Sequence, residues 1–194
     1  MKYRQTIQTT AELASWYDNK YQEMQGTWHT PPEECNRHLD ALGVPFDMSK
    51  TLLDVGCGGG HLLEQAEKRV QTWGLDISHQ AIYYAYQRCK RTYLDRSSVD
   101  APRLVGAYDY IISLGSLEHV IDLDRALDNI HDALTPDGRW YFYVPNEKWI
   151  HEDQPNERTC TDWEWFQLFS RHGLRTISFV RYEDNTAFLG VRKP

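Results

Sequence analysis

The chain has 194 residues, of which 41% are hydrophobic and 25% charged, and this balance indicates one globular domain rather than a disordered or fibrous chain. Its formal net charge is −7, so the excess of cations that binds phosphate backbones is missing, and nucleic acid is disfavoured as a partner. No apolar stretch approaches the roughly 18 residues that span a bilayer, and the first residues carry no apolar secretory segment. We therefore expect a cytoplasmic protein without membrane contact.

Four cysteines, Cys35, Cys57, Cys89 and Cys160, are widely spaced and form no Cys-x-x-Cys pair. A chain of this length buries a core without disulfides, so we expect free thiols in a reducing compartment. Cys35 and His38 could share one helix face, but no second pair completes a tetrahedral set of ligands. We expect no metal site.

The first strong helix signal begins at Thr30, which is followed by two prolines and Glu33. This pattern predicts Thr30 as the N-cap, proline in the first turn and a capping-box glutamate. The helix then has an apolar face and ends at Gly43. Before Thr30 no core pattern is visible.

A buried strand is predicted at Thr51–Val55, and a turn of alternating glycines, Gly56–Gly60, follows it before the next helix. The second strand covers Gln71–Leu75 and ends at Asp76, and Ser78 can cap the helix after it. Residues 90–106 should contain a third strand, whose limits the weak periodicity does not define.

The second half of the chain continues the alternation of strands and helices. The predicted elements are a strand at Tyr108–Leu114, a helix from Leu123 that Pro136 and Gly138 terminate, a strand at Arg139–Val144, a helix with a capping box at Thr161 and Glu164, and a closing hairpin of Ile177–Val180 and Ala187–Val191 joined through Glu183–Asn185. This order predicts an α/β fold, doubly wound, with a mostly parallel sheet. Its ligand is expected beyond the carboxyl ends of the strands.

The glycine turn points to a bound nucleoside. Gly56, Gly58 and Gly60 let a ligand approach the backbone, and Asp76, 20 residues after Gly56, can accept hydrogen bonds from ribose hydroxyls. A dinucleotide fingerprint requires a third glycine where this chain has His61 or Leu63, and no Gly-Lys-Ser/Thr phosphate loop occurs.

Four segments, Leu53–Gly60, Gly74–Ser78, Tyr108–Val120 and Leu134–Gly138, resemble the successive motifs of class I S-adenosylmethionine-dependent methyltransferases. The subtype is the small methyltransferase domain (type 11, ubiquinone-biosynthesis-like). The resemblance covers roughly half of the chain and implies a Rossmann-like, seven-stranded, mostly parallel sheet with a C-terminal antiparallel hairpin. We expect a single domain over 1–194, with an N-terminal lid and helix in 1–45 and the Rossmann-like core in 46–194.

The resemblance also implies the residues that contact S-adenosylmethionine. These are Asp54, Gly56, Cys57, Gly58, Asp76, Ile77, Asp100, Ala101, Leu114 and Gly115. Asp54 and the glycines would line the methionine moiety, Asp76 the ribose, Ile77 the adenine, and Leu114 and Gly115 the sulfonium. For the adenine contact after the third strand, Asp95-Arg96 is the alternative to Asp100-Ala101.

His119 is the candidate catalytic residue, because imidazole titrates near neutrality and relatives with the same Leu-Glu-His-Val stretch turn this histidine towards the substrate. The alternative is that His119 only packs at the turn. Glu118 is the second candidate for a base, and His61 is expected over the cofactor loop.

Aromatic residues flank the expected pocket in sequence: Trp16, Tyr17, Tyr21 and Trp28 before it, and Trp149, Trp163 and Trp165 after it. They suit a lid that excludes water from the reaction, and they equally suit ordinary packing.

The predicted function is methyl transfer to an oxygen or nitrogen of a small metabolite. Ser113–Ser116 stands where methyltransferases of nucleobase amines carry Asn/Asp-Pro-Pro-aromatic, which argues with the acidic charge against nucleic acid. Two alternatives stay open: an inactive cofactor-binding partner subunit, and a nucleotide-cofactor oxidoreductase, which the broken glycine fingerprint disfavours.

Overall fold

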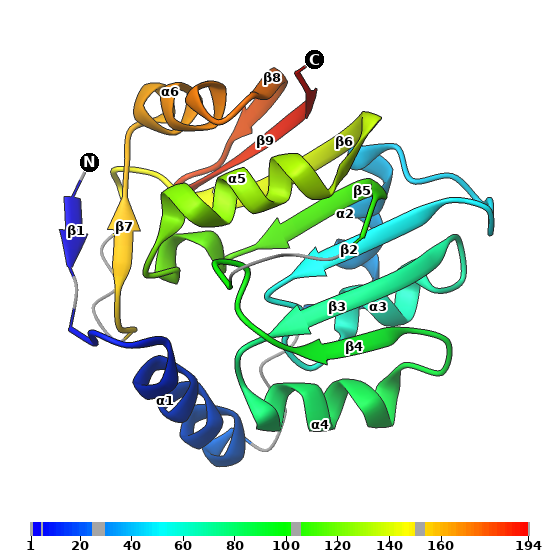
Figure 1. Cartoon of the computed structure of the whole chain (residues 1–194), viewed down its shortest axis with the longest axis horizontal. Helices are drawn as coiled ribbons and strands as arrows, with labels where there is room; N and C mark the ends of the chain where they lie inside the picture. Colours follow the sequence, from blue (N-terminus) through cyan, green and yellow to red (C-terminus); the bar gives the residue numbers. More distant parts are fainter. Residues whose placement is uncertain (1, 5, 25–29, 102–105, 150–153, 194) are drawn as a thin grey trace.

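The computed structural model describes residues 2–4, 6–24, 30–101, 106–149 and 154–193. Its centre is a seven-stranded sheet in the spatial order β4-β3-β2-β5-β6-β9-β8 (Figure 1). The strands are β4 (Tyr93–Arg96), β3 (Gln71–Asp76), β2 (Thr51–Val55), β5 (Tyr108–Leu114), β6 (Leu134–Pro145), β9 (Asn185–Arg192) and β8 (Leu174–Arg181). The first five run parallel, and β9 pairs antiparallel with both β6 and β8. The predicted Rossmann-like sheet with a C-terminal hairpin is confirmed.

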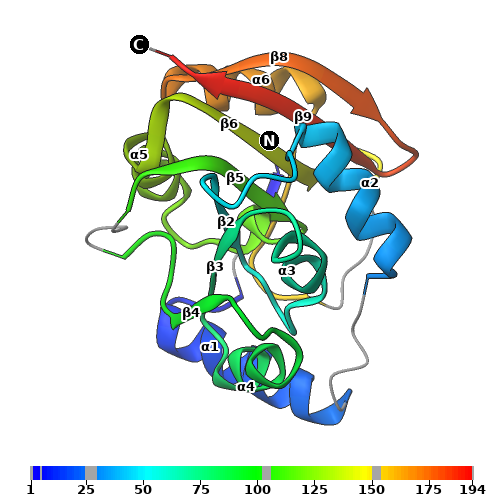
Figure 2. The same cartoon turned by 90° about the vertical axis from the view of Figure 1, so that its right-hand side faces the viewer.

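Helices cover both faces of this sheet, and Figure 2 shows the sheet between α5 on one side and α2 and α3 on the other. The helices are α1 (Thr10–Glu23), α2 (Pro32–Leu42), α3 (His61–Ala66), α4 (His79–Arg88), the short 3-10 helix η1 (Leu117–His119), α5 (Leu123–Ala133) and α6 (Asp162–Arg171). None of the helices in these described ranges combines the length and the apolar character that crossing a bilayer requires.

The central strands contain consecutive apolar residues because their side chains alternate between two separate cores. On β2, Leu53 packs with α5 and α6, whereas Leu52 packs with α2 and α3. Ile111 and Ile112 on β5 repeat this division. A continuous apolar run is therefore the signature of a strand that is covered on both faces.

Two predicted helix caps are present, one at the start of α4 and one at the start of α6. The Ser78 hydroxyl accepts a 3.0 Å hydrogen bond from the Ala81 amide at the start of α4. Thr161 and Glu164 form the predicted capping box of α6. Such caps satisfy amides that have no partner within the helix.

Three predicted boundaries need correction. Helix α2 has Pro31 rather than Thr30 at its N-cap, because Pro32 with its fixed φ already suits the first helical position. Helix α5 ends at Ala133, and Leu134 pairs with Tyr108, so Pro136 and Gly138 lie inside β6 instead of terminating the helix. The third strand is the short β4 at the sheet edge, whose largely exposed residues explain its weak periodicity.

A second, small layer lies outside the main sheet. Strand β1 (Lys2–Arg4) pairs antiparallel with β7 (Glu157–Thr159), and α1 packs along α4 (Figure 1). Asn156, directly before β7, connects this strand to the segment between β1 and α1, because its side-chain oxygen accepts 2.9 Å hydrogen bonds from the amides of Thr6 and Ile7. Only Leu13 and Ala14 of α1 are buried, which is why no core pattern was visible before Thr30.

Candidate active site

A cavity of about 380 Å³ opens at the carboxyl ends of the parallel strands, where α1 and β7 lie opposite the strand tips (Figure 1). This volume lies in the range of small-molecule sites. Of the predicted site residues, those that line it are Asp54, Gly56, Cys57, Gly58, Asp76, Ile77, Leu114, Gly115 and His119. The topology therefore assembles the glycine turn, the acidic strand end and the histidine around one space.

Two properties of the turn after β2, its backbone conformation and its close packing, require glycine at positions 56 and 58. Gly56 and Gly58 have φ values of +75° and +53°, in the left-handed region that favours glycine. A Cβ on Gly56 would lie 2.0 Å from the Ser116 hydroxyl, and one on Gly58 would lie 2.5 Å from the Tyr21 hydroxyl. The turn thus brings bare backbone against both neighbouring walls of the cavity.

Asp76 at the end of β3 is held by the backbone around it. One carboxylate oxygen accepts a 2.9 Å hydrogen bond from the Gly58 amide, and the other accepts one of 2.9 Å from the Ser78 amide. Burial raises the pKa of Asp76 to about 6, although these backbone bonds oppose the shift. Each oxygen keeps a lone pair for a ligand donor.

Asp54 at the end of β2 lies in the same wall and is 4% exposed. Burial, and next the charge of Asp76, raise the pKa of Asp54 to about 8. Two buried carboxyls facing one cavity favour a ligand that brings hydroxyl donors or positive charge, because either would replace the lost hydration.

Replacing Asp54 with asparagine is expected to stabilise the ligand-free protein at pH 8 by an amount on the order of a few kcal/mol. The folded chain keeps a proton that the unfolded chain releases near its ordinary pKa of 3.8, so wild-type stability falls as the pH rises from about 4 to about 8. Urea unfolding at pH 5 and pH 8 measures the gain, with the exposed Asp137→Asn as control. An equal gain at both pH values would contradict a raised pKa of Asp54 in the folded chain.

The loop after β5 carries the second group of functional side chains. Glu118 and His119 lie in η1, both line the cavity, and they are 5% and 7% exposed. The Nδ1 atom of His119 lies 3.0 Å from the carbonyl oxygen of Pro155, and its Nε2 atom lies 3.7 Å from Oε1 of Glu118. Burial lowers the pKa of His119 to about 4 and raises that of Glu118 to about 8. At neutral pH the imidazole is therefore uncharged.

Arg158 on β7 fixes this loop and was not predicted. Its buried guanidinium donates hydrogen bonds to the carbonyl oxygens of Glu118 (3.2 Å), Val120 and Ile121 (2.9 Å). A three-residue strand has too few positions to show periodicity, so the sequence carries no signal for this contact.

Helix α1 supplies the wall opposite the strand tips. Tyr17 and Tyr21 line the cavity, and burial raises the pKa of both hydroxyls well above the ordinary value. Asp18 anchors the helix to α4, accepting hydrogen bonds from the Ser78 hydroxyl (2.7 Å) and the Gln80 amide (3.1 Å).

The aromatic residues predicted around the pocket lie in different environments, and only some of them face the cavity. Tyr17, Tyr21 and Trp149 line the cavity, whereas Trp165 is a core residue and Trp163 is 62% exposed on α6. Trp28 lies outside the described residues.

The residues after β4 are not placed as predicted. Asp100 and Ala101 do not line the cavity, and Asp100 accepts a 3.1 Å hydrogen bond from the Asp122 amide. The alternative pair, Asp95 and Arg96, also lies outside the lining. The lining residues of this segment are Ser97, Ser98 and Val99. The Val99 carbonyl is held by the Asn129 side chain at 2.7 Å.

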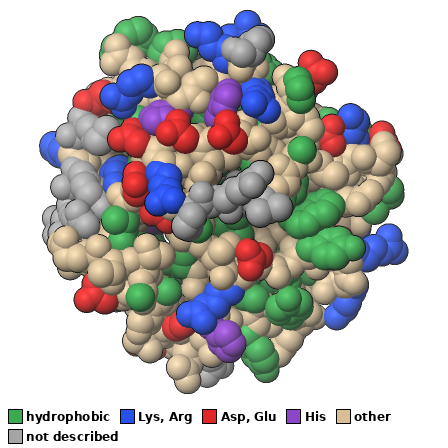
Figure 3. Space-filling view, in the orientation of Figure 1, with side chains coloured by type: hydrophobic (Ala, Val, Ile, Leu, Met, Phe, Trp, Pro, Cys, Tyr) green, Lys and Arg blue, Asp and Glu red, His purple; other side chains and the backbone are tan. Residues whose placement is uncertain are grey.

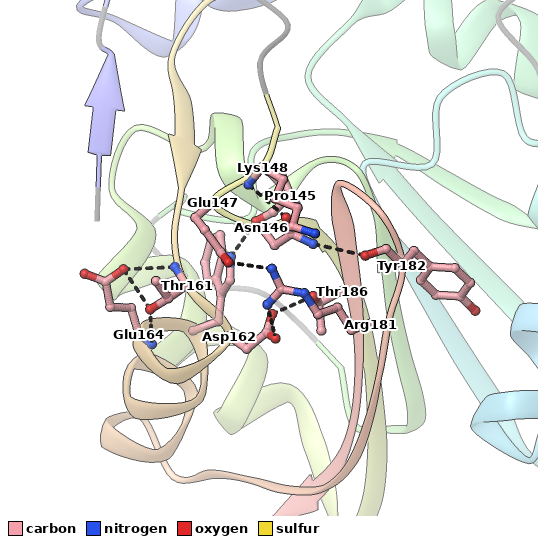
Figure 4. Close-up of polar contacts among 11 residues, drawn as sticks. Pro145, Asn146, Glu147, Lys148, Thr161, Asp162, Glu164, Arg181, Tyr182 and Thr186 are labelled. Atoms are coloured by element: carbon pink, nitrogen blue, oxygen red, sulfur yellow. Dashed lines mark hydrogen bonds and ion pairs between the residues drawn. The ribbon is translucent and has the colours of Figure 1, made fainter.

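The wall after β6 is built on a polar network around Arg181 (Figure 4). Arg181 pairs with Glu147 and with Asp162, and Asp162 also accepts a 2.6 Å hydrogen bond from Thr186. Asn146 accepts a 2.9 Å bond from the Lys148 amide and forms the turn that leads to Trp149. The network thereby ties the hairpin of β8 and β9 to this wall, where Tyr143, Trp149 and Asn185 line the cavity.

Known proteins match this chain in sequence. The profile of a family described as "Methyltransferase domain" matches residues 27–181. A ubiquinone biosynthesis O-methyltransferase of Vibrio campbellii is 32% identical over 148 residues, which cover 72% of this chain and 62% of that protein. The juvenile hormone acid O-methyltransferase of Drosophila melanogaster is 38% identical over 104 residues, or 47% of this chain and 35% of that protein. The chain thus spans about a third to less than two thirds of these relatives.

Solved structures share the fold at low sequence identity. The 1,6-didemethyltoxoflavin-N1-methyltransferase of Burkholderia thailandensis superposes with a TM-score of 0.75 at 18% identity, over 95% of this chain and 88% of that one. The [4+2]-cyclase SpnF superposes with a TM-score of 0.78 at 16% identity, over 98% of both chains. Since a cyclase has the same fold, the function must be argued from the cavity.

Proposed function

The chain belongs to the methyltransferase domain family, and we propose that it transfers a methyl group from S-adenosylmethionine to an oxygen or nitrogen of a small-molecule acceptor. Family membership confirms the resemblance drawn from the sequence motifs. The observation that carries the proposal is the buried Asp76 beside the glycine turn, both lining one cavity at the strand ends. Calorimetric titration with S-adenosylmethionine tests it.

The lining residues fit this cofactor in charge and in hydrogen bonding. Asp76 would accept the two ribose hydroxyls, since its oxygens keep lone pairs beside the backbone bonds. Asp54 would face the ammonium of the methionine moiety, whose charge offsets the burial of that carboxylate. Ile77 would pack on the adenine, and Leu114 and Gly115 would border the sulfonium.

For the far edge of the adenine we propose Ser98 and Val99 in place of the two pairs predicted from sequence. They are the part of this segment that reaches the cavity, and the contact of Asn129 with the Val99 carbonyl holds the segment there. Asp100 serves the loop instead, through its bond to the Asp122 amide.

The bound cofactor supplies an electrophilic methyl group, so the protein has to align the acceptor and, where needed, take up its proton. His119 lies at the end of the cavity formed by η1, with Nδ1 directed to the Pro155 carbonyl. A carbonyl oxygen only accepts, so Nδ1 carries the hydrogen and Nε2 is left as an acceptor for the substrate. With a pKa of about 4, His119 acts best by orienting the acceptor group.

A small molecule is the acceptor that suits the cavity. Helix α1 closes one side, and the lining aromatics Tyr17, Tyr143 and Trp149 offer flat apolar surfaces. Acidic and basic side chains are interspersed on the face seen in Figure 3, in keeping with an acidic chain that is not built to hold a polyanion.

The sequence predicts that the N-terminal segment is a lid over the cavity, and hydrogen exchange of α1 tests this prediction. Amide hydrogens of α1 should exchange fast in the free protein and at least about tenfold more slowly with bound S-adenosylhomocysteine, because few of its residues are buried without a ligand. Exchange followed by mass spectrometry measures this, with the amides of β2 as the internal control. Equal protection of α1 in both states would identify it as a fixed wall.

A further inference from the structure

Glu118 has a buried carboxyl oxygen with no partner in the described part of the chain. Its Oε2 atom accepts and donates no hydrogen bond there, although the residue is only 5% exposed and lines the cavity. Leaving such an atom unpaired costs free energy, so its presence in a cavity wall points to a ligand that completes it.

A second acceptor lies beside it. The Nε2 atom of His119 is 3.7 Å from Oε1 of Glu118, and the bond from Nδ1 to the Pro155 carbonyl leaves Nε2 without a hydrogen. The same end of the cavity therefore presents two adjacent acceptors to one group of the substrate. A hydroxyl has a single hydrogen to offer them, whereas a protonated or neutral primary amine has at least two.

The charges around the cavity disfavour a substrate that carries an acidic group. Among the described residues that line it there is no lysine or arginine, and its carboxyl groups are those of Asp54, Asp76 and Glu118. A carboxylate or phosphate group would lose its hydration here and meet no lysine or arginine among the described lining residues in exchange.

We propose that the methyl acceptor is an amine, whose nitrogen is held by Oε2 of Glu118 and Nε2 of His119 against the aromatic side chains of Tyr17, Tyr143 and Trp149. This inference rests on the proposed function, and it narrows the acceptor from any oxygen or nitrogen to an amine nitrogen. It also separates this chain from its relative named for an acid substrate.

The transfer balances with Glu118 as the proton acceptor. The ammonium form of the substrate gives one proton to the Glu118 carboxylate, which frees the nitrogen lone pair. The nitrogen–carbon bond then forms as the sulfonium–methyl bond breaks, and that electron pair stays on sulfur. The product leaves as a methylated ammonium ion, and Glu118 releases its proton to solvent. Burial places the pKa of Glu118 at about 8 in the empty cavity, and the positive charge of a bound ammonium favours the ionised carboxylate, which can then take up the proton.

The test compares matched amines and acids on the chain saturated with S-adenosylhomocysteine. The probes are tyramine against 3-(4-hydroxyphenyl)propanoate, and phenethylamine against 3-phenylpropanoate. We expect each amine to bind at least about tenfold more tightly than its acid, and Glu118→Gln to weaken amine binding by about ten- to a hundredfold. Binding of S-adenosylhomocysteine should change less than about twofold in that variant, which also reports that it folds.

The exposed Glu183→Gln is the matched control, because it removes the same charge away from the cavity. If S-adenosylhomocysteine does not bind the wild type, the proposed function fails and this inference fails with it. If it binds but the amines show no preference over the acids, or Glu118→Gln leaves amine binding unchanged, only the inference is overturned.

Discussion

Replacing Asp76 with alanine is expected to weaken S-adenosylmethionine binding by about ten- to a hundredfold, the value of a pair of charge-assisted hydrogen bonds. The loss has two sources in this structure. The ribose hydroxyls lose their acceptor, and the amides of Gly58 and Ser78, each 2.9 Å from a carboxylate oxygen, lose theirs. The second loss loosens the glycine turn itself.

Asparagine at position 76 keeps the shape of the side chain but removes its charge and one of its two acceptor oxygens. Its NH2 group would face one of the two backbone amides, donor against donor, so Asp76→Asn should bind the cofactor about as weakly as Asp76→Ala. The exposed Asp137→Ala is the control and should bind as the wild type does. Calorimetric titration measures all three, and wild-type affinity in Asp76→Ala would remove this residue from the ribose site.

Replacing His119 with alanine is expected to lower turnover by about 10²-fold, the effect of a misaligned acceptor, while cofactor affinity stays within about twofold. His119 lies in η1 after β5, whereas Asp76, the proposed ribose ligand, ends β3. Because burial holds its pKa near 4, the pH dependence of turnover should show no titration of histidine near its ordinary value of 6.5. Single-turnover methyl transfer across this pH range measures both expectations.

Two further variants separate the nitrogens of His119. The amide NH2 of asparagine can replace Nδ1 in the bond to the Pro155 carbonyl, but it offers nothing in place of Nε2. Glutamine can place its carbonyl oxygen near Nε2. We expect His119→Gln to retain more activity than His119→Asn. The reverse order, or full activity in His119→Ala, would assign the residue to packing against the 155–158 segment.

The parts of the fold that the sequence predicted are those in which local pattern and burial agree. The strand at Thr51–Val55 is apolar because both its faces are covered, and the caps at Ser78 and Thr161 act within a few residues. The same holds for the site: the glycine turn follows β2, Asp76 ends β3 and His119 lies in the loop after β5, and parallel strands bring their ends together.

The features that sequence reasoning missed depend on contacts between distant segments. Asn156 binds Thr6 and Ile7 across about 150 positions, and Arg158 reaches the loop at 118–121. Neither contact leaves a periodic trace. Asp100 lies outside the cavity lining for a related reason, since β4 is short and exposed, and the chain after it turns Asp100 towards α5.

The role of Glu118 became visible only with the side chains in place. In sequence it is one acidic residue beside a more obvious histidine. In the structure it is buried, its Oε2 atom has no partner among the described residues, and it faces the cavity that also holds Asp54 and Asp76. The sequence favours His119 over Glu118 as the base. Burial reverses this preference, because it raises the pKa of Glu118 and lowers that of His119.

The central claim is that the cavity at the strand ends binds S-adenosylmethionine, and calorimetric titration of the purified chain tests it most directly. We expect one molecule of S-adenosylmethionine or S-adenosylhomocysteine to bind per chain, and we expect no measurable heat with NAD. The missing third glycine and the carboxyls of Asp54 and Asp76 leave no place for a pyrophosphate. Binding of NAD with comparable affinity, or no binding of either sulfur compound, would contradict the account.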